Sequence, residues 1–435
     1  MRLASSALSL AILLSGSVSA AEETLHISAP RLERLLLGLS AFGKNPEGGV
    51  SRLAFSEEDR AARAWVLEKM KGAGLEVWVD PAANIHARRT GSDPSLPVIL
   101  FGSHIDSVPQ GGNFDGGVGS MAALEVMLSL RDRQAITRHP LEMVIWSDEE
   151  GVHYAKPYLG SRAATRGLDS GDLELEDEQG VSIAEWLRRY GLDPEQIGTA
   201  RMDPGTIAAY LELHIEQGAV LERRGIQIGV VEGIVGIDEF RVVVEGFANH
   251  AGTTPMEVRR DALMAAARLI LAAREEVMVG SGRQVGNVGW IQVVPGAPNV
   301  VPGLVRMNIE LRDLRREVID DMIGRIREAA TAIADEEGVS ISIERYASDE
   351  PALTDPRLQE LIEKVAKGAG FSTLRMPSGA GHDAQSLGRV GIPIGMIFVP
   401  SKNGISHSPR EWTDWEDCAR GAEVLYLTLL ELDRK

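Results

Sequence analysis

Three short apolar runs in the first half of the chain each end abruptly in polar residues, and this pattern limits the folds that the chain can adopt. The runs are PVILFGSHIDSV (97–108), LEMVIWSDEE (141–150) and AAYLELHIEQG (208–218). Segments with helical spacing, such as 57–74, alternate with them. Strands that alternate with helices predict an α/β fold with a mostly parallel sheet, in which ligands bind beyond the carboxyl ends of the strands.

The order of elements changes in the middle of the chain. From about residue 219 to residue 334 it becomes strand, helix, two strands and a helix. Two helices over an antiparallel sheet predict an inserted α+β domain of the ferredoxin-like kind. A chain of 435 residues has room for two domains. We therefore expect a catalytic domain made of residues 21–218 and 335–435, split around the insertion.

The first twenty residues have the pattern of a secretory signal peptide. Arg2 precedes an apolar stretch, and Val18-Ser19-Ala20 forms a small-residue cleavage site. The alternative is a buried N-terminal helix, but the apolar stretch ends in Ser and Gly and is followed by the charged segment AEET. We expect export, most simply to a periplasm, and no later run is long enough to span a membrane. Cys418 is the only cysteine, so no internal disulfide can form.

The charge balance limits the partners. The formal net charge of −18 argues against binding to nucleic acid or to an anionic membrane surface. The negative net charge does not exclude a small anionic substrate, because local positive groups or a metal can override the field of the whole protein.

Histidines and carboxylates gather at the predicted strand ends. His104 and Asp106 follow the first run, Glu149 and Glu150 the second, and His214 the third. Asp115 lies in the glycine-rich turn GGNFDGGVG, and His407 lies in ISHSPREW. Each residue alone is more typical of an ordinary core or surface position. Together they suit two Zn²⁺ or Mn²⁺ ions bridged by a carboxylate, with one glutamate of the pair as a ligand and the other as a general base. Asp106 is placed to accept the second ring N–H of His104.

Seven motifs, in order along the chain, resemble one known family. They are GSHIDSVPQGGNFDGGVG, DEEG, LHIEQG, NHAGTTPMEVRRDAL, PNVVPG, SGAGHDAQ and SHSPREW. This set is similar to the amidase/hydantoinase/carbamoylase branch of the dinuclear-zinc aminoacylase and peptidase superfamily. The resemblance runs through nearly the whole chain after the signal peptide. It implies hydrolysis of a linear amide, most simply the ureido group of an N-carbamoyl-L-amino acid or of a ureido acid such as allantoate, with release of ammonia and carbon dioxide.

The resemblance also implies roles for individual residues. The metal ligands would be His104, Asp115, Glu150, His214 and His407, with Asp115 bridging the two ions. Glu149 would be the general base and Asp106 would orient His104. Substrate contacts would come from Gln217, from the pair Asn299 and Arg312, which would bind a carboxylate, and from His382, next to Asp383. His250 would reach the active site from the inserted domain and stabilise the oxyanion, and the same domain would form a homodimer interface at about 219–334.

Several alternatives remain open at this point. His250 alone is more typical of an ordinary capping or surface histidine, and Arg312 can instead form an ion pair with Glu310, Asp313 or Glu317. Nitrogen and oxygen ligands suit zinc, the first choice, but also manganese, cobalt and nickel. The alternative functions are a periplasmic aminopeptidase or dipeptidase with the same metal core, and a binding protein without catalysis. The intact base argues against a pure binding protein, and HIEQG and GAGHDA favour the carbamoylase branch over the peptidases.

Overall fold

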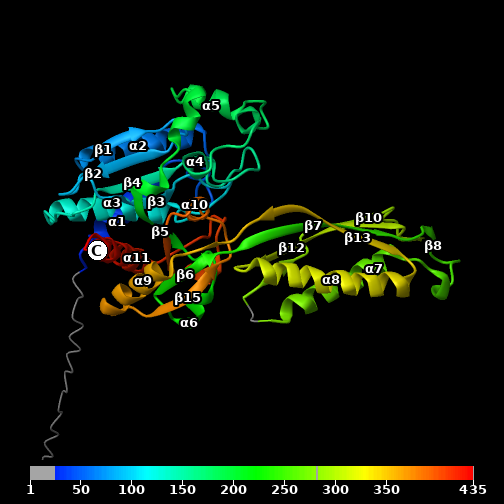
Figure 1. The fold of residues 1–435 in the computed structure, drawn as a ribbon. Helices are drawn as coiled ribbons and strands as arrows, with labels where there is room; N and C mark the ends of the chain where they lie inside the picture. The colour runs from blue at the N-terminus through cyan, green and yellow to red at the C-terminus, as the bar shows by residue number, and fades with distance from the viewer. Residues whose placement is uncertain (1–24, 281–282, 435) are drawn as a thin grey trace, which may run out of the picture.

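The computed structural model describes residues 25–280 and 283–434, so the predicted signal peptide lies outside the described residues. Figure 1 shows a large domain and an elongated smaller domain that projects from it. The helices of ordinary α type are α1 (Ala29–Leu39), α2 (Glu57–Gly72), α3 (Gly117–Asp132), α4 (Leu159–Ala164), α5 (Ile183–Arg189), α6 (Val220–Arg224), α7 (Ala262–Met278), α8 (Arg316–Glu337), α9 (Pro356–Gly368), α10 (Asp383–Gly388) and α11 (Trp415–Asp433).

Within the described residues, no helix is both long enough and apolar enough to cross a lipid bilayer.

A mixed sheet forms the centre of the large domain. Its strands are β1 (Glu76–Val79), β2 (Ile85–Arg89), β3 (Val98–His104), β4 (Leu141–Trp146), β5 (Ile207–Ile215), β6 (Ile228–Ile234), β14 (Ala352–Leu353), β15 (Thr373–Ser378) and β16 (Ile394–Val399). They follow the order β1-β2-β4-β3-β5-β16-β6-β14, with β15 paired to β6. The neighbouring pairs β4–β3, β3–β5 and β5–β16 are parallel, whereas the edge pairs β1–β2 and β6–β14 are antiparallel. The predicted α/β class is therefore confirmed, with the parallel strands at the centre of the sheet.

Helices cover this sheet on both faces. Side chains of α1, α2, α3, α9 and α11 pack on one face against residues such as Leu211 and Leu213 of β5. On the other face Tyr210 of the same strand packs with Ala384 of α10 and Ala164 of α4. Successive side chains of β5 point to opposite faces of the sheet and so belong to two separate cores. Tyr210, Glu212 and His214, each two residues apart, therefore point to the same face.

The smaller domain contains a separate antiparallel sheet. Its strands are β7 (Gly236–Glu245), β9 (Val285–Asn287), β10 (Ile291–Val294), β12 (Leu304–Asp313) and β13 (Ser340–Asp349), in the order β10-β12-β7-β13 with β9 paired to β12. Helices α7 and α8 pack against it around a core of their own. Apart from the short strand β9 between α7 and β10, the sheet strands and helices follow the order β7-α7-β10-β12-α8-β13, which is the split βαβ arrangement of ferredoxin-like domains. A short ribbon of β8 (Asn249–His250) and β11 (Val300–Val301) extends its far end (Figure 1).

The strand pairing moves both predicted boundaries of the insertion. Residues 219–234 belong to the large domain, because β6 pairs with β15 and β16. Residues 340–349 belong to the smaller one, because β13 pairs with β7 along its whole length. The second sheet thus extends from Gly236 to Asp349, rather than from 219 to 334. Apolar alternation identifies a strand in the sequence but does not tell which of two sheets it joins.

Candidate active site

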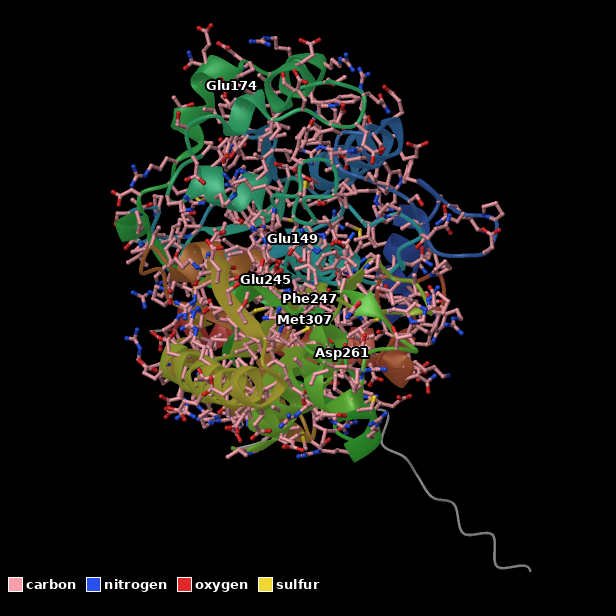
Figure 2. All side chains as sticks on the ribbon, turned by 90° about the vertical axis from the view of Figure 1, so that its right-hand side faces the viewer. Glu149, Glu174, Glu245, Phe247, Asp261 and Met307 are labelled. Atoms are coloured by element: carbon pink, nitrogen blue, oxygen red, sulfur yellow. The ribbon has the colours of Figure 1, made fainter. Side chains whose placement is uncertain are left out.

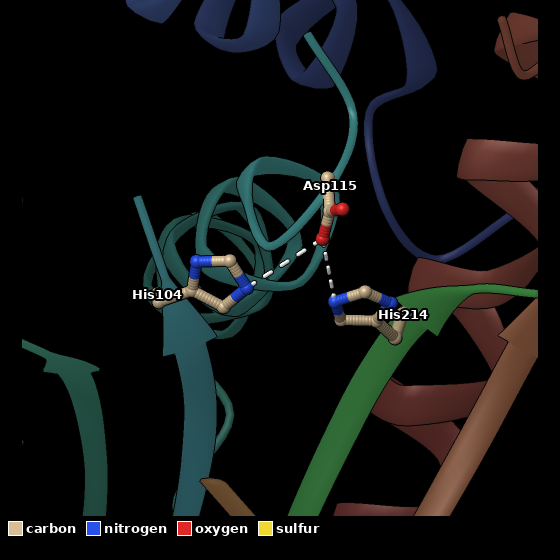
Figure 3. A group of neighbouring side chains, drawn as sticks. All are labelled: His104, Asp115 and His214. Atoms are coloured by element: carbon tan, nitrogen blue, oxygen red, sulfur yellow. Dashed lines mark ion pairs between the residues drawn. The ribbon is translucent and has the colours of Figure 1, made fainter. Parts of the chain in front are cut away.

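The carboxyl ends of parallel strands bring the first group of predicted ligands together. His104 ends β3, His214 lies near the end of β5, and Asp115 lies in the turn that leads into α3 (Figure 3). Asp115 Oδ1 is 3.2 Å from Nε2 of His214 and 3.6 Å from Nε2 of His104. All three side chains are buried. Their facing atoms are spaced as ligands would be around one ion about 2 Å from each of them.

The second nitrogen of each histidine ring faces a backbone carbonyl. Nδ1 of His104 is 3.1 Å from the carbonyl oxygen of Asp106, and Nδ1 of His214 is 2.9 Å from that of Ile215. An N–H donated there leaves Nε2 of each ring without a proton, as a metal ligand requires. Nε2 of His214 also lies 3.2 Å from the backbone N–H of Gly116. The prediction that the Asp106 carboxylate orients His104 needs a correction, because its Oδ1 is 3.7 Å away. That carboxylate instead accepts a 3.1 Å hydrogen bond from the backbone N–H of Glu150.

A second group uses the other oxygen of the same aspartate. Asp115 Oδ2 is 3.1 Å from Nε2 of His407, which in turn is 3.7 Å from Oε2 of Glu150. Asp115 therefore belongs to two clusters of potential ligands, one for each of its oxygens. A third cluster, of Glu212, His214 and His382, shares His214 with the first, so the two clusters cannot use it independently. The nitrogen and oxygen donors of the first two clusters fit a pair of divalent ions bridged by Asp115.

Glu149 lies beside the first group. Its Oε2 is 3.8 Å from Nε2 of His104. Burial raises the pKa of Glu149 well above its usual range, and the negative charges of Glu150 and Asp383 add to the increase although His104 opposes it. A carboxylate with a raised pKa is suited to taking up and releasing a proton, as a general base requires. Figure 2 labels Glu149 in the large domain, together with Glu245, Phe247, Asp261 and Met307 of the smaller one.

Two further predicted residues lie close to these groups. Gln217 donates from Nε2 to Asp115 Oδ2 over 2.8 Å. The ring of His382 lies 4.5 Å from that of His214, centroid to centroid. Nε2 of His382 is 2.8 Å from the Ser378 hydroxyl, and burial lowers the pKa of His382 well below its usual range. His382 is therefore a neutral side chain packed against a potential metal ligand.

Arg312 lies at the junction of the two domains. Its Nη1 donates to the carbonyl oxygen of Gly379 over 2.7 Å, and its Nε is 2.7 Å from Oε1 of Glu310. The ion pair with Glu310, one of the alternatives for this residue, is thus present. The guanidinium nevertheless also contacts the loop that precedes His382, on the side of the small domain that faces the large one.

His250 and Asn299 lie at the opposite end of the small domain. Arg312 pairs with Ile237 and Leu304 with Glu245, so the eight residue steps of β12 separate the two ends by about 26 Å, at roughly 3.3 Å per residue. Strand β8, which contains His250, lies at the far end of the small domain (Figure 1), and it pairs with β11, which directly follows Asn299.

Two predictions therefore fail within a single chain, because the insertion is extended. His250 does not reach the metal groups, and Asn299 does not lie beside Arg312. His250 is exposed and its Nδ1 accepts hydrogen bonds from the backbone N–H groups of Gly252 and Thr253, which is the capping alternative.

The structure adds residues that the sequence did not single out. Glu411 and Ser406, from the motif that carries His407, contact the turn of Asp115. Tyr158 donates its backbone N–H to the carbonyl of Glu149. A Cβ on Gly381 would lie 1.6 Å from the hydroxyl oxygen of Tyr158, so the phenol of Tyr158 fills the space next to this glycine. The position of Glu411 four residues after His407 was a signal for its role, whereas nothing in the segment around Tyr158 pointed to the site.

This combination of fold and site defines a metal-dependent hydrolase. Residues 100–431 match the model of peptidase family M20/M25/M40, and the chain belongs to this family. It is 43% identical over 406 residues to N-carbamoyl-L-amino acid amidohydrolase of Geobacillus stearothermophilus, which covers 93% of this chain and 99% of the relative. It is 35% identical to allantoate amidohydrolase of Escherichia coli strain K12, with 92% and 97% covered.

A relative of known crystal structure has the same fold as this chain. The crystal structure of an amidase of the hydantoinase/carbamoylase family from Burkholderia multivorans matches with a TM-score of 0.87 at 35% identity, covering 94% of this chain and 98% of that one. The family resemblance inferred from the seven motifs is thereby confirmed.

Proposed function

We propose that this protein hydrolyses the ureido group of a small acid, most simply an N-carbamoyl-L-amino acid. N-carbamoyl-L-amino acids and allantoate, which appear in the names of the two relatives, carry both a ureido group and a carboxylate. The observation that carries the proposal is the position of Glu149 beside the first of two ligand groups that share Asp115. Arg312, at the junction with the large domain, supplies a group that can bind the substrate carboxylate.

Each side chain then has a task in the reaction. The residues that would hold two divalent ions, zinc as the first choice, are His104 and His214 for one, Glu150 and His407 for the other, and Asp115 for both. Such ions polarise a carbonyl group and lower the pKa of water. Glu149 takes a proton from the attacking water and delivers it to the leaving nitrogen. Arg312 holds the carboxylate, and Gln217 fixes Asp115. The C–N bond to the amino acid breaks and leaves carbamate, which then decomposes to carbon dioxide and ammonia.

Ammonia release tests this proposal. Metal-reconstituted protein is given N-carbamoyl-L-amino acids, N-carbamoyl-β-alanine, allantoate, ureidoglycolate and unblocked dipeptides. We expect ammonia from at least one ureido acid and none after chelation. Free amino acids from dipeptides without ammonia would identify a peptidase instead. Bound metal without any turnover on the panel would support the binding-protein alternative.

We also propose that the protein is a homodimer in which the small domain of one subunit completes the site of the other. His250 and Asn299 are exposed and lie beyond Leu304, which is itself about 26 Å along the sheet from Arg312, so a second copy is the simplest means of bringing them to a substrate. The small domain also exposes large apolar side chains, among them Leu271, Met278, Val285 and Trp290. Such side chains would lose their contact with water if a second copy packed against this domain.

Mixed subunits test the arrangement. In a 1:1 mixture of Glu149→Gln and His250→Ala chains, half of the dimers are hybrid, and each hybrid has one complete site if His250 acts on the partner. We expect about a quarter of the wild-type activity, while either variant alone is nearly inactive. A mixture no more active than the average of its parents would reject the exchange between subunits.

Export to the periplasm is a further proposal, tested by whether the N-terminus of the mature protein is Ala21.

A further inference from the structure

The two ligand groups differ in how the fold holds them. His104 and His214 are buried at the ends of central strands, and backbone carbonyls fix their rings. His407 belongs to the loop between β16 and α11, has a left-handed backbone (φ 51°), and its side chain is 49% exposed. The first group is therefore preformed by the sheet, whereas the second depends on whatever holds this loop against the turn of Asp115.

Glu411 makes that connection. Its side chain is buried, and its Oε1 accepts hydrogen bonds from the backbone N–H groups of Phe114, over 2.8 Å, and Asp115, over 3.1 Å. Its Oε2 is 2.8 Å from the hydroxyl of Ser406, which is also 3.1 Å from Asp115 Oδ2. The Glu411 carboxylate thus joins Ser406, the residue before His407, to the turn of Asp115, which is 296 residues from Glu411 in the sequence.

The surroundings are shaped for this carboxylate. A Cβ on Gly112 would lie 1.9 Å from Glu411 Oε1, so the glycine leaves the space that the carboxylate occupies. Aromatic packing of Trp412 against Phe114, with ring centroids 5.3 Å apart, gives the loop a second attachment that does not involve Glu411. Loss of the Glu411 carboxylate would therefore loosen the loop without releasing it.

We infer that Glu411 is a positioning residue that sets the affinity of the second metal site, formed by Asp115, Glu150 and His407. It acts by fixing the bridging aspartate and the His407 loop relative to each other. The first site, with its histidines held by the sheet, depends on it much less. This inference rests on the two-ion site of the proposed function, and changes in residues that orient metal ligands typically weaken binding by 10–100-fold.

Calorimetric titration of the metal-free protein with Zn²⁺, supported by elemental analysis, tests the inference. We expect the wild type to bind two ions. Glu411→Ala should bind the first with unchanged affinity and the second about 10–100-fold more weakly. Glu411→Gln, whose amide oxygen can still accept the two backbone N–H groups, should recover most of that loss. Glu416→Ala, an exposed glutamate on α11, is the matched control and should bind both ions normally.

The outcomes separate the inference from the proposed function. Wild-type protein that binds fewer than two ions would reject the two-ion site and with it the proposed function. Wild-type affinity for both ions in Glu411→Ala, or an equal loss of affinity at both sites, would overturn the role of Glu411 and leave the proposed function standing. If melting curves show that Glu411→Ala does not fold, Ser406→Ala removes only the hydroxyl link. Ser406→Ala should lower the affinity for the second ion only, by a smaller factor than Glu411→Ala. An unchanged affinity for the second ion would then overturn the inference.

Discussion

Arg312 donates a 2.7 Å hydrogen bond to the carbonyl oxygen of Gly379, which connects the sheet of the small domain to the loop that leads to His382. A guanidinium at this junction can hold a substrate carboxylate only while the two domains keep this relative position. The same side chain is paired with Glu310, which orients the guanidinium before any substrate binds.

Arg312→Lys should therefore raise KM for ureido acids by roughly tenfold to a hundredfold, because an ammonium cannot reproduce the planar pair of hydrogen bonds to a carboxylate. Metal content should not change. Steady-state kinetics with elemental analysis checks both. Arg306→Lys, an exposed arginine on the same strand, is the control and should behave as wild type. A normal KM in Arg312→Lys would show that the carboxylate is bound elsewhere.

Glu149→Gln should lower kcat by roughly 10²–10⁴-fold, because the proton-accepting group is lost while the shape of the side chain is kept. The ligand groups remain, so we expect both ions to stay bound. Turnover of the ureido substrate and metal stoichiometry are the two measurements. Glu174→Gln, an exposed position far from the site (Figure 2), serves as the control. Near-normal turnover by Glu149→Gln would remove it from the mechanism.

The sequence predicted which potential metal ligands lie close together, because elementary topology brings them to one edge of the sheet. The carboxyl ends of adjacent parallel strands lie at one edge of a sheet, so polar residues after β3, β4 and β5 must be neighbours. Asp115 was predictable from the glycine-rich turn that follows β3 and precedes α3. Local chain geometry was sufficient for each of these positions.

Long-range distances were not predictable in the same way. The motifs of His250 and Asn299 say which residues they contain but not how far the inserted sheet extends from the large domain. The contact between Glu411 and the turn of Asp115 spans almost the whole catalytic domain in sequence. The expectation that Asp106 shares a strand face with His104 fails because β3 ends at His104. The Asp106 carboxylate is turned toward the backbone N–H of Glu150, which needs an acceptor.

Gly116 tests how tightly the turn of Asp115 is built around His104. A Cβ at this position would lie 2.4 Å from the His104 ring, and the residue has φ +58°, which side chains rarely adopt. Gly116→Ala should therefore displace His104 or the turn, with loss of metal from the first group and a lower Tm. Gly117→Ala is the neighbouring control, since its Cβ would meet only Leu39 at 3.5 Å. Equal metal content in the two variants would contradict the close packing of ring and turn.

A buried ionic group outside the active site predicts a pH dependence of stability. His86 lies between two carboxylates, with Nδ1 2.8 Å from Glu142 Oε1 and Nε2 3.4 Å from Asp80 Oδ2. Its ring stacks on Trp78 with the centroids 5.0 Å apart. Burial opposes the charge, but the two carboxylates outweigh it and raise the pKa of His86 to about 9. Despite its own burial, contact with His86 keeps the pKa of Glu142 below its usual value.

The signs of these shifts define the pH window. Because the folded pKa of His86 exceeds its ordinary value of 6.5, its contribution to stability is complete below pH 6.5 and is lost as the pH rises to about 9. The loss is roughly 3 kcal/mol at most, from about 1.4 kcal/mol per unit of pKa. The contribution of Glu142 has the opposite dependence and is lost only in acid. We therefore expect the urea concentration at the unfolding midpoint of the wild type to decrease as the pH is raised from 6.5 to 9. The midpoint of His86→Gln should change much less over this range. Parallel curves for the two proteins would mean that His86 is neutral in the folded state.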